Sequence, residues 1–328
     1  MGTMSIYVRF LKDWALPLGM AAGAVGYVFF HFFPLLSPFK PLAEAISADV
    51  IPLFIFLMLF FTFCKINPLE LLPRRWHLWL ILIQVFGCLA VVVLLESVCS
   101  VSRRVLWEGL MLCFVCPTAA AAAVVTGKLG GSEASLTTYS ILSNIAAAIV
   151  IPFSFPMIES VAPGSFGSRF VMILLKVFPL LILPLVSAWA VRLFLPRFHR
   201  FIVTHLRNAA FYLWAFNLII VVGQAIRSMV NSTVPLSVKV SLAFVGLVAC
   251  ILFFVTGKVI GSHYGERISA GQALGQKNTV FAIWISYTYL PPVVMLAPSS
   301  YIIWQNVYNS WQIRRKQKKD KMVAADNL

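Results

Sequence analysis

The chain has 328 residues, of which 60% are hydrophobic and 11% are charged, and its mean hydropathy is +0.90. Soluble globular domains carry about 25% charged residues, so this composition excludes an ordinary soluble protein. The formal net charge of +15 requires no nucleic-acid partner, because basic loops beside an anionic cytoplasmic leaflet account for it. We therefore expect an integral membrane protein whose largest partner is the lipid bilayer.

Long apolar runs recur along the chain, and a transmembrane helix needs about 20 such residues to cross roughly 30 Å of hydrocarbon. They predict an all-α membrane protein with about ten transmembrane helices. The expected spans are, in chain order, 14–34, 46–64, 77–96, 105–126, 133–153, 169–194, 208–226, 238–260, 268–290 and 292–311.

The positions of the basic residues predict the orientation. If both termini lie in the cytoplasm, most of the 26 Lys and Arg residues fall on the cytoplasmic side, as the positive-inside rule requires. They include Arg74 and Arg75, the stretch from Arg192 to Arg207, and the run from Arg314 to Lys321. We expect the protein to lie in the plasma (cell inner) membrane, with both termini in the cytoplasm.

Two of the expected spans are interrupted by small and polar residues. The span from Val105 to Thr126 is interrupted at Cys116–Ala121, and the span from Ile268 to Leu290 at Gly271–Asn278. A helix break at membrane depth leaves backbone groups without partners, so it persists only where it is packed in protein or lines a cavity. Paired breaks in two halves of a chain indicate the binding site of a secondary transporter.

The two breaks occupy corresponding positions in two sets of five spans. Residues 1–200 hold the first repeat, spans one to five, together with span six, which starts the second repeat. Residues 201–312 hold the remaining spans, and 313–328 form a basic cytoplasmic tail that we expect to be solvated and partly disordered. An odd number of spans inverts the second copy, so we expect a five-plus-five inverted repeat in which two discontinuous helices cross.

The helix that restarts after each break would present free N–H groups and a positive dipole end, which favour an anion. Pro117 suits such a restart, since its missing N–H would be unpaired there anyway. Small residues at a break have an alternative use, which is close helix packing. The residues expected to contact a small organic anion are Thr118, Ala119, Ala120, Asn278 and Thr279, with Asn144 of span five lining the cavity.

Lys277 places an ionisable group in the middle of a span, where such groups are costly and are functional candidates by default. Three interpretations are open. The lysine is a permanent internal cation that neutralises an anionic substrate, or it also exchanges a proton and couples transport to a proton gradient. Alternatively it is structural, reaching an interface or pairing with a carboxylate. Asp49 and Glu108 are the acidic residues expected within the membrane.

At these residues the chain resembles the bile acid:sodium symporter family over most of its length. The likeness is clearest at Cys116-Pro117 with the small residues that follow, and at Gly275–Thr279. Gln84 matches a polar family position, and Trp304-Gln305-Asn306 is similar to part of the family's final helix. The resemblance implies ten spans in an inverted repeat with crossing helices, and inward transport of organic anions coupled to two sodium ions.

The chain departs from this family at the sodium ligands. The family's first break reads Pro-Gly-Gly-Thr-Ala-Ser-Asn, and its Ser and Asn, which help to bind sodium, correspond to Ala122 and Ala123 here. The second break reads Glu-x-Gly-x-Gln-Asn, whose Glu and Gln correspond to Ala273 and Lys277. Sodium is a hard cation that requires oxygen ligands and is repelled by an ammonium group.

We therefore expect no metal site, with Lys277 and Gln84 as the ion-coupling positions in place of sodium ligands. A shift of the alignment by one residue would place Gln272 and Gln276 at the family's Glu and Gln, and would keep oxygen ligands there.

Other classes of function find less support. The five histidines show no paired metal-ligand spacing, so we expect no enzyme and no cofactor. A cation/proton antiporter-like carrier remains an alternative, although the centre of the chain lacks membrane aspartates. A non-transporting sensor on a transporter fold is a further alternative. The preferred prediction is a sodium-independent secondary transporter of an organic anion that works by alternating access.

Overall fold

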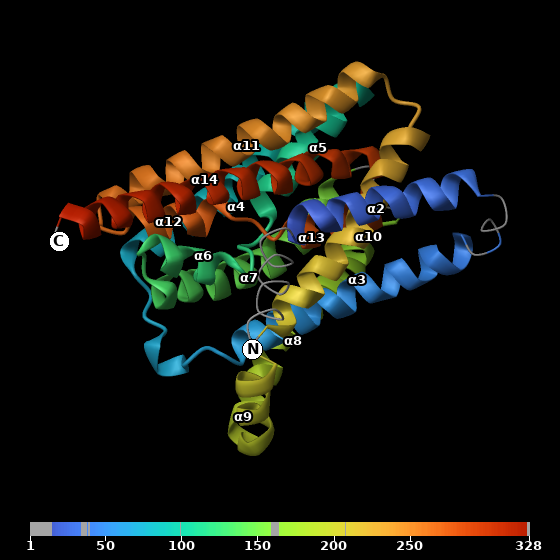
Figure 1. The fold of residues 1–328 in the computed structure, drawn as a ribbon. Coiled ribbons are helices and arrows are strands. Elements are labelled where there is room, and N and C mark those ends of the chain that lie inside the picture. The colour runs from blue at the N-terminus through green and yellow to red at the C-terminus, as the bar shows by residue number, and fades with distance from the viewer. Residues whose placement is uncertain are drawn as a thin grey trace. The chain divides into compact units, whose positions relative to one another are not determined.

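A computed structural model describes residues 15–33, 38, 40–98, 100–158, 164–206 and 208–326. Throughout these residues the secondary structure is helical, and the single β-type feature is an isolated antiparallel bridge between Thr118 and Lys277. The chain divides into two compact units, each assembled from two separate stretches, and Figure 1 labels their helices. The first unit comprises Met1–Cys64 and Leu183–Thr233, and the second comprises Lys65–Ile182 and Val234–Leu328.

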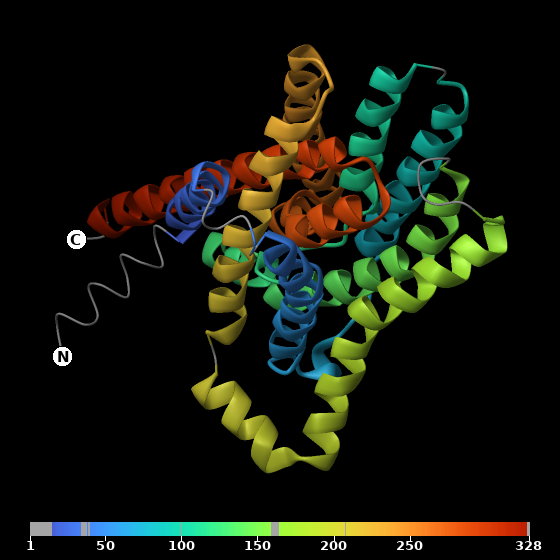
Figure 2. The ribbon, with the colours of Figure 1, turned by 90° about the vertical axis from the view of Figure 1, so that its right-hand side faces the viewer.

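The first unit is a bundle in which α10 packs against both α2 and α3. Gly23 of α2 allows one close approach, because a Cβ atom there would lie 2.5 Å from the carbonyl oxygen of Ile219. After α8 the chain changes direction at Leu195–Pro196 and continues as a short separate helix, α9 (Figure 2). The helices of this unit are α2 (Ala15–Phe32), α3 (Lys40–Phe63), the end of α8 (Phe166–Phe194), α9 (Pro196–His205) and α10 (Ala209–Asn231).

The second unit contains both interrupted segments. In it α11 packs against α12, α14 and α5, and α4 packs against α5 and α7. Its helices are α4 (Arg75–Glu96), α5 (Val101–Val115), α6 (Ala122–Leu129), α7 (Glu133–Ser154), the start of α8, α11 (Leu236–Ser262), α12 (Arg267–Gly275), α13 (Thr279–Tyr289) and α14 (Leu296–Asp326), with short 3₁₀ helices η2 (Pro68–Glu70), η3 (Phe155–Met157) and η4 (Pro292–Met295).

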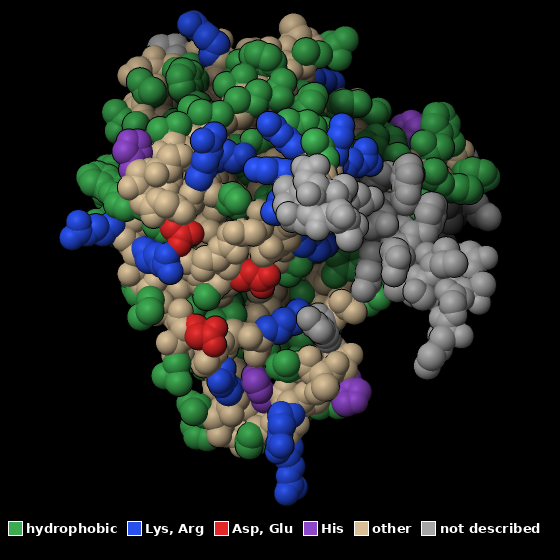
Figure 3. Space-filling model, turned by 60° about the vertical axis from the view of Figure 1, so that its left-hand side comes forward, with side chains coloured by type: hydrophobic (Ala, Val, Ile, Leu, Met, Phe, Trp, Pro, Cys, Tyr) green, Lys and Arg blue, Asp and Glu red, His purple; other side chains and the backbone are tan. Residues whose placement is uncertain are grey.

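Five of the described helices are long and apolar enough to cross a membrane, and two shorter apolar helices, Leu18–Phe32 and Asp49–Phe63, accompany them. Their outward side chains are strongly apolar, as at Leu175, which is 68% exposed. On the face in Figure 3, hydrophobic side chains are widely spread, and Lys and Arg side chains outnumber those of Asp and Glu. Together these features make the chain an integral membrane protein. The five helices are Arg75–Glu96, Glu133–Met157, Phe166–Phe194, Ala209–Asn231 and Leu236–Ser262.

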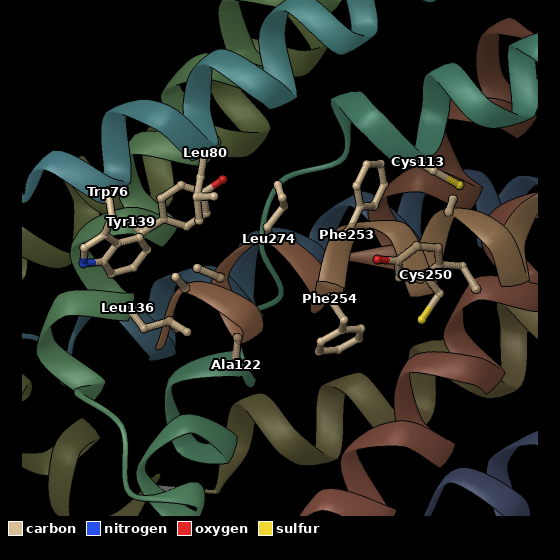
Figure 4. Close-up of a cluster of buried hydrophobic side chains, with 14 residues drawn as sticks. Trp76, Leu80, Cys113, Ala122, Leu136, Tyr139, Cys250, Phe253, Phe254 and Leu274 are labelled. Carbon is tan, nitrogen blue, oxygen red and sulfur yellow. The ribbon is translucent and has the colours of Figure 1, made fainter. Parts of the chain in front are cut away.

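A cluster of buried apolar side chains includes residues that flank both interrupted segments (Figure 4). It includes Ala122 at the start of α6 and Leu274 near the end of α12. The rings of Trp76 and Tyr139 stack within it, with centroids 5.8 Å apart. Within a bilayer such packing gains van der Waals contact rather than transfer from water, and here it joins α6 and α12 to α4, α7 and α11.

Two expectations about local structure need correction. The break expected at Gly271–Asn278 is shorter, since α12 continues to Gly275 and Gln276 still donates its N–H to the carbonyl of Gln272 at 2.9 Å. Gly271 lies within this helix. Its lack of a side chain leaves room for the aliphatic part of Lys258, which packs where a Cβ atom would be. The tail expected to be partly disordered is helical as far as Asp326, because α14 continues through it.

Candidate functional site

The two interrupted segments cross as short non-helical stretches that share hydrogen bonds. Ala119 donates its N–H to the carbonyl oxygen of Gln276 at 2.8 Å, and Asn278 donates to that of Pro117 at the same distance. These bonds flank the Thr118–Lys277 pair and form the isolated bridge. Backbone groups exposed by a helix break at membrane depth need partners, and here each segment supplies them to the other. The expected first break, Cys116–Ala121, has these bounds in the structure.

Lys277 extends from this bridge to the end of α5. Its side chain is 2% exposed, and Nζ donates to the carbonyl oxygens of Cys116 at 3.0 Å and Phe114 at 3.4 Å. Nζ also lies 4.9 Å from the centroid of the Phe253 ring. The last carbonyls of a helix have no partner within the helix and carry its negative dipole end. The lysine therefore occupies a position that suits a cation.

No acidic residue in the described part of the chain forms a hydrogen bond or an ion pair with Lys277. Among the residues described, the ion pairs are Arg74–Glu266, Arg104–Glu108 and Lys316–Asp320, and none includes Lys277. Of the two acidic candidates from the sequence, Glu108 is buried and lies 3.9 Å from Arg104 on its own helix. Asp49 is exposed. Carbonyl dipoles and an aromatic ring, rather than a carboxylate, surround Lys277 Nζ.

Gln84 supports the same end of α5 from α4. It donates Nε2–H to the carbonyl of Val115 at 3.2 Å, and its Oε1 accepts from the hydroxyl of Ser143 at 2.8 Å. Ser143 in turn accepts the N–H of Thr118 at 3.2 Å. Tyr139 adds a longer bond to Gln84 Oε1 at 3.4 Å. Gln84 and Lys277 together satisfy three consecutive carbonyls, those of residues 114–116.

The second break has corresponding supports. Gln305 of α14 accepts the backbone N–H of Lys277 at 2.9 Å and donates to its carbonyl at 3.3 Å. The hydroxyl of Thr118 donates to the carbonyl of Ala273 at 2.7 Å, and that of Tyr301 donates to Gly275 at 2.7 Å. Two carbonyls at the end of α12, those of Ala273 and Gly275, thus accept from side chains of other elements, as those at the end of α5 do.

The residues that sequence reasoning assigned to substrate lie in different environments. Thr118, Asn278 and Thr279 are buried within the crossing, whereas Ala119 and Ala120 are half-buried. The N–H groups of Thr118 and Ala119 are engaged in the bonds above, and α6 begins at Ala122, after the break, rather than directly at Pro117.

The two restarting helices differ at their first turns. The side chain of Asn278 caps α13 by accepting the N–H of Phe281 at 3.3 Å. The N-terminus of α6 has no side-chain cap, because the residue before it is Ala121. At the other end, Gly130 is the C-cap residue, and its φ of 86° suits glycine. Of the two restarting helices, α6 is therefore the one without a side-chain cap.

Asn144 of α7 lies buried beside this region. Its Nδ2 donates to the carbonyl of Ser140 at 2.7 Å on its own helix. Its Oδ1 is buried and has no hydrogen-bond partner within the described part of the chain.

Sequence reasoning named Gln305 only for its likeness to the family's final helix, without a supporting role, and missed Tyr301. They lie one turn apart on α14, and both face the end of α12. The polar residues of this span, which include Ser300, Asn306 and Asn309, were the available signal, but nothing in the sequence says which backbone groups Gln305 and Tyr301 meet.

Long apolar helices and two interrupted segments that cross at a buried lysine define the class of this protein, which is that of membrane transporters with discontinuous helices. The model of the SBF-like CPA transporter family (DUF4137) matches residues 27–303, and the chain belongs to this family. The match confirms the resemblance to bile acid:sodium symporters and favours transport over catalysis. The search of curated proteins found no match to the chain.

Proposed function

We propose that this protein is a sodium-independent secondary transporter of a small organic anion, in which the Lys277 ammonium group takes the place of the sodium ions. The observation that carries the proposal is the position of Nζ, buried and bound to the carbonyl oxygens of Phe114 and Cys116. Carbonyl oxygens at a helix C-terminus are ligands that a hard cation would use. A tethered ammonium that already fills this position removes the need for sodium and repels it.

We further propose ten transmembrane spans in a five-plus-five inverted repeat, with both termini cytoplasmic in the plasma membrane. Each interrupted segment counts as one span, since the nine residues of α12 and the eleven of α13 extend about 14 Å and about 16 Å at 1.5 Å per residue. The hydrogen bonds around the bridge support the repeat, because those made by Thr118 have counterparts made by Lys277.

The composition of the two compact units also supports an inverted repeat. The first unit contains spans one, two and seven with the end of span six, and the second contains the other spans. Each unit thus draws corresponding elements from both repeats. In this proposal, alternating access is a movement of one unit relative to the other around the fixed crossing.

For the substrate we propose a position at the start of α6, next to Ala119 and Ala120. An uncapped helix N-terminus presents N–H groups and a positive dipole end, both of which favour an anionic group. Ala119 and Ala120 are half-buried and small, so a ligand can approach the backbone there. Lys277, which is paired with the neighbouring Thr118, adds positive charge. Thr118 and Asn278 then hold the backbone of the crossing rather than forming the surface of the site, while Thr279 and Asn144 stay buried beside it.

A stability screen tests this proposal on purified protein. Carboxylates, sulfates and sulfonates are compared for their effect on the unfolding temperature in choline chloride and in sodium chloride, at two pH values. We expect an anion that stabilises the wild type without sodium and has no effect on Lys277→Gln. Stabilisation that occurs only with sodium would contradict the proposal.

The ligands found in the screen are then tested as radiolabelled tracers in proteoliposomes. Uptake that rises with an imposed pH gradient would add proton coupling at Lys277 to the proposal. Uptake that is indifferent to the gradient would leave Lys277 as a permanent cation.

A further inference from the structure

The short helix α9 (Pro196–His205) has three faces of different chemistry, and one of them fixes its orientation within the first unit. Ile202 is 1% exposed, and His199, one turn earlier, donates Nε2–H to the carbonyl of Cys64 at 2.8 Å. Cys64 directly follows α3. Because this face is held against the end of α3, the other two faces of α9 have defined directions.

The second face is aromatic and exposed. Phe198 and Phe201 are 50% and 48% exposed, and their rings lie nearly parallel with centroids 6.5 Å apart. The ring of Phe201 also stacks on that of His205 at 4.9 Å. The residues at the end of α8 continue this apolar surface, since Leu193 is 75% exposed and Phe194 is 79% exposed.

The third face is basic. Arg197 and Arg200 are both exposed and lie three residues apart, so they project from one side of the helix. Neither forms an ion pair within the described residues, and the sequence between residues 183 and 233 contains no Asp or Glu. The nearest stretch of chain therefore offers these guanidinium groups no carboxylate.

We propose that α9 lies along the surface of the bilayer and binds the phosphate groups of anionic phospholipids. Phe198 and Phe201 enter the upper part of the acyl chains, while Arg197 and Arg200 donate paired hydrogen bonds to phosphate oxygens. An apolar face beside a basic face is the composition of an interfacial helix. Guanidinium groups match phosphate geometry with two parallel N–H donors.

Continuity with a membrane span favours a lipid surface over a protein partner. α8 is one of the helices long and apolar enough to cross the membrane, and its exposed last residues lead directly into α9. Pro196 separates the two helices, since it lacks an N–H and disfavours helical geometry at Leu195. The apolar surface of the span thus turns at this point and continues along α9, where a bilayer surface would be.

The charge of the lipid tests this proposal directly. The full chain is placed in nanodiscs of phosphatidylcholine, or of phosphatidylcholine mixed with phosphatidylglycerol, and the unfolding temperature is measured in each. We expect the wild type to be more stable in the anionic mixture. Substituting both Arg197→Gln and Arg200→Gln should remove more than half of this gain, whereas Arg103→Gln, an exposed arginine on α5, should keep it. Retention of the full gain by the double variant would overturn the proposal.

A second measurement leaves the arginines in place, so it stands if the double variant fails to fold. p-Benzoylphenylalanine replaces Phe198 in cells, and irradiation cross-links the position to its neighbour. We expect a mass increase equal to one phospholipid. A cross-link to another polypeptide, or no lipid adduct at all, would overturn the placement of α9 at the bilayer surface.

Discussion

Thr118 and Lys277 stand opposite each other in the crossing and make equivalent hydrogen bonds. Each donates its backbone N–H to a side chain of the long helix that follows its own break, Ser143 for Thr118 and Gln305 for Lys277. Each side chain then donates to carbonyl oxygens at the end of the opposite half-helix, Thr118 to Ala273 and Lys277 to the last residues of α5. The hydroxyl of Thr118 thus bonds the end of α12, and the amine of Lys277 bonds the end of α5.

Replacing Lys277 with methionine should destabilise the protein. Lys277→Met keeps an unbranched chain but leaves the carbonyls of Phe114 and Cys116 without a donor. Each buried acceptor left unsatisfied costs about 1–3 kcal/mol, and relief of ammonium desolvation offsets only part of this loss. Thermal unfolding in detergent measures the change. Lys176→Met, at an exposed position, is the matched control and should be near neutral, whereas equal stability of both variants would contradict the prediction.

Gln305 should stabilise the backbone at Lys277 more than it stabilises its own helix. Gln305→Met removes both bonds to Lys277, the acceptor at 2.9 Å and the donor at 3.3 Å, and leaves two buried backbone groups unpaired. We expect a loss of about 2 kcal/mol or more, measured as a lower unfolding temperature. Gln317→Met, on the exposed part of α14, should change stability little. A wild-type unfolding temperature for Gln305→Met would show that the bonds contribute nothing.

Gln84 and Ser143 should act as one unit. Ser143 joins the N–H of Thr118 to Gln84 Oε1, and Gln84 joins this pair to the carbonyl of Val115. Residues in one hydrogen-bond network show coupling energies of about 0.5–3 kcal/mol. A double-mutant cycle with Ser143→Ala and Gln84→Met should therefore give a double variant less destabilised than the sum of the single ones. Strict additivity would mean that the two side chains act independently.

The close packing of α11 on α12 depends on Gly257. A Cβ atom at this position would lie 2.4 Å from the carbonyl oxygen of Ala270, and a backbone atom cannot move aside as a flexible side chain can. Gly257→Ala should therefore destabilise the protein by about 1–3 kcal/mol through overpacking.

Gly26→Ala provides the opposite case. Nothing lies within 4 Å of its Cβ position in α2, and alanine in a helix is favoured over glycine by about 0.5–1 kcal/mol. Thermal unfolding should therefore show changes of opposite sign for the two variants. A stabilising effect of Gly257→Ala would mean that the two helices are not held in contact.

The sequence was sufficient to predict features that a single segment determines. The first break has its expected bounds because Pro117 cannot continue α5. The second break was placed too early, since Gly271 and Gly275 read as helix breakers. In the structure both lie in α12, where Lys258 and Phe254 occupy the space that side chains would need. Glycine here reflects close packing between helices, which local propensity does not report.

The contacts of the candidate site depended on information that the sequence lacks. Lys277 could be recognised as unusual, but its contacts with the end of α5 arise only when two segments more than 150 residues apart cross. The same holds for Gln305, whose partners lie on another segment. The stretch from Arg192 to Arg207 was expected only as a group of basic residues on the cytoplasmic side, because it contains no apolar run, although its aromatic and basic residues divide between faces once α9 forms.

The effect of sodium on stability tests the central claim most directly. Wild type and Lys277→Gln are unfolded thermally in sodium chloride and in choline chloride at equal ionic strength. We expect the wild type to unfold at the same temperature in both salts, because the amine of Lys277 already occupies the carbonyl oxygens at the end of α5. Lys277→Gln should unfold at a higher temperature in sodium chloride than in choline chloride. The substitution frees these carbonyl oxygens and adds the amide oxygen of glutamine as a further ligand. Stabilisation of the wild type by sodium would contradict the account, because a sodium site would then exist beside the lysine.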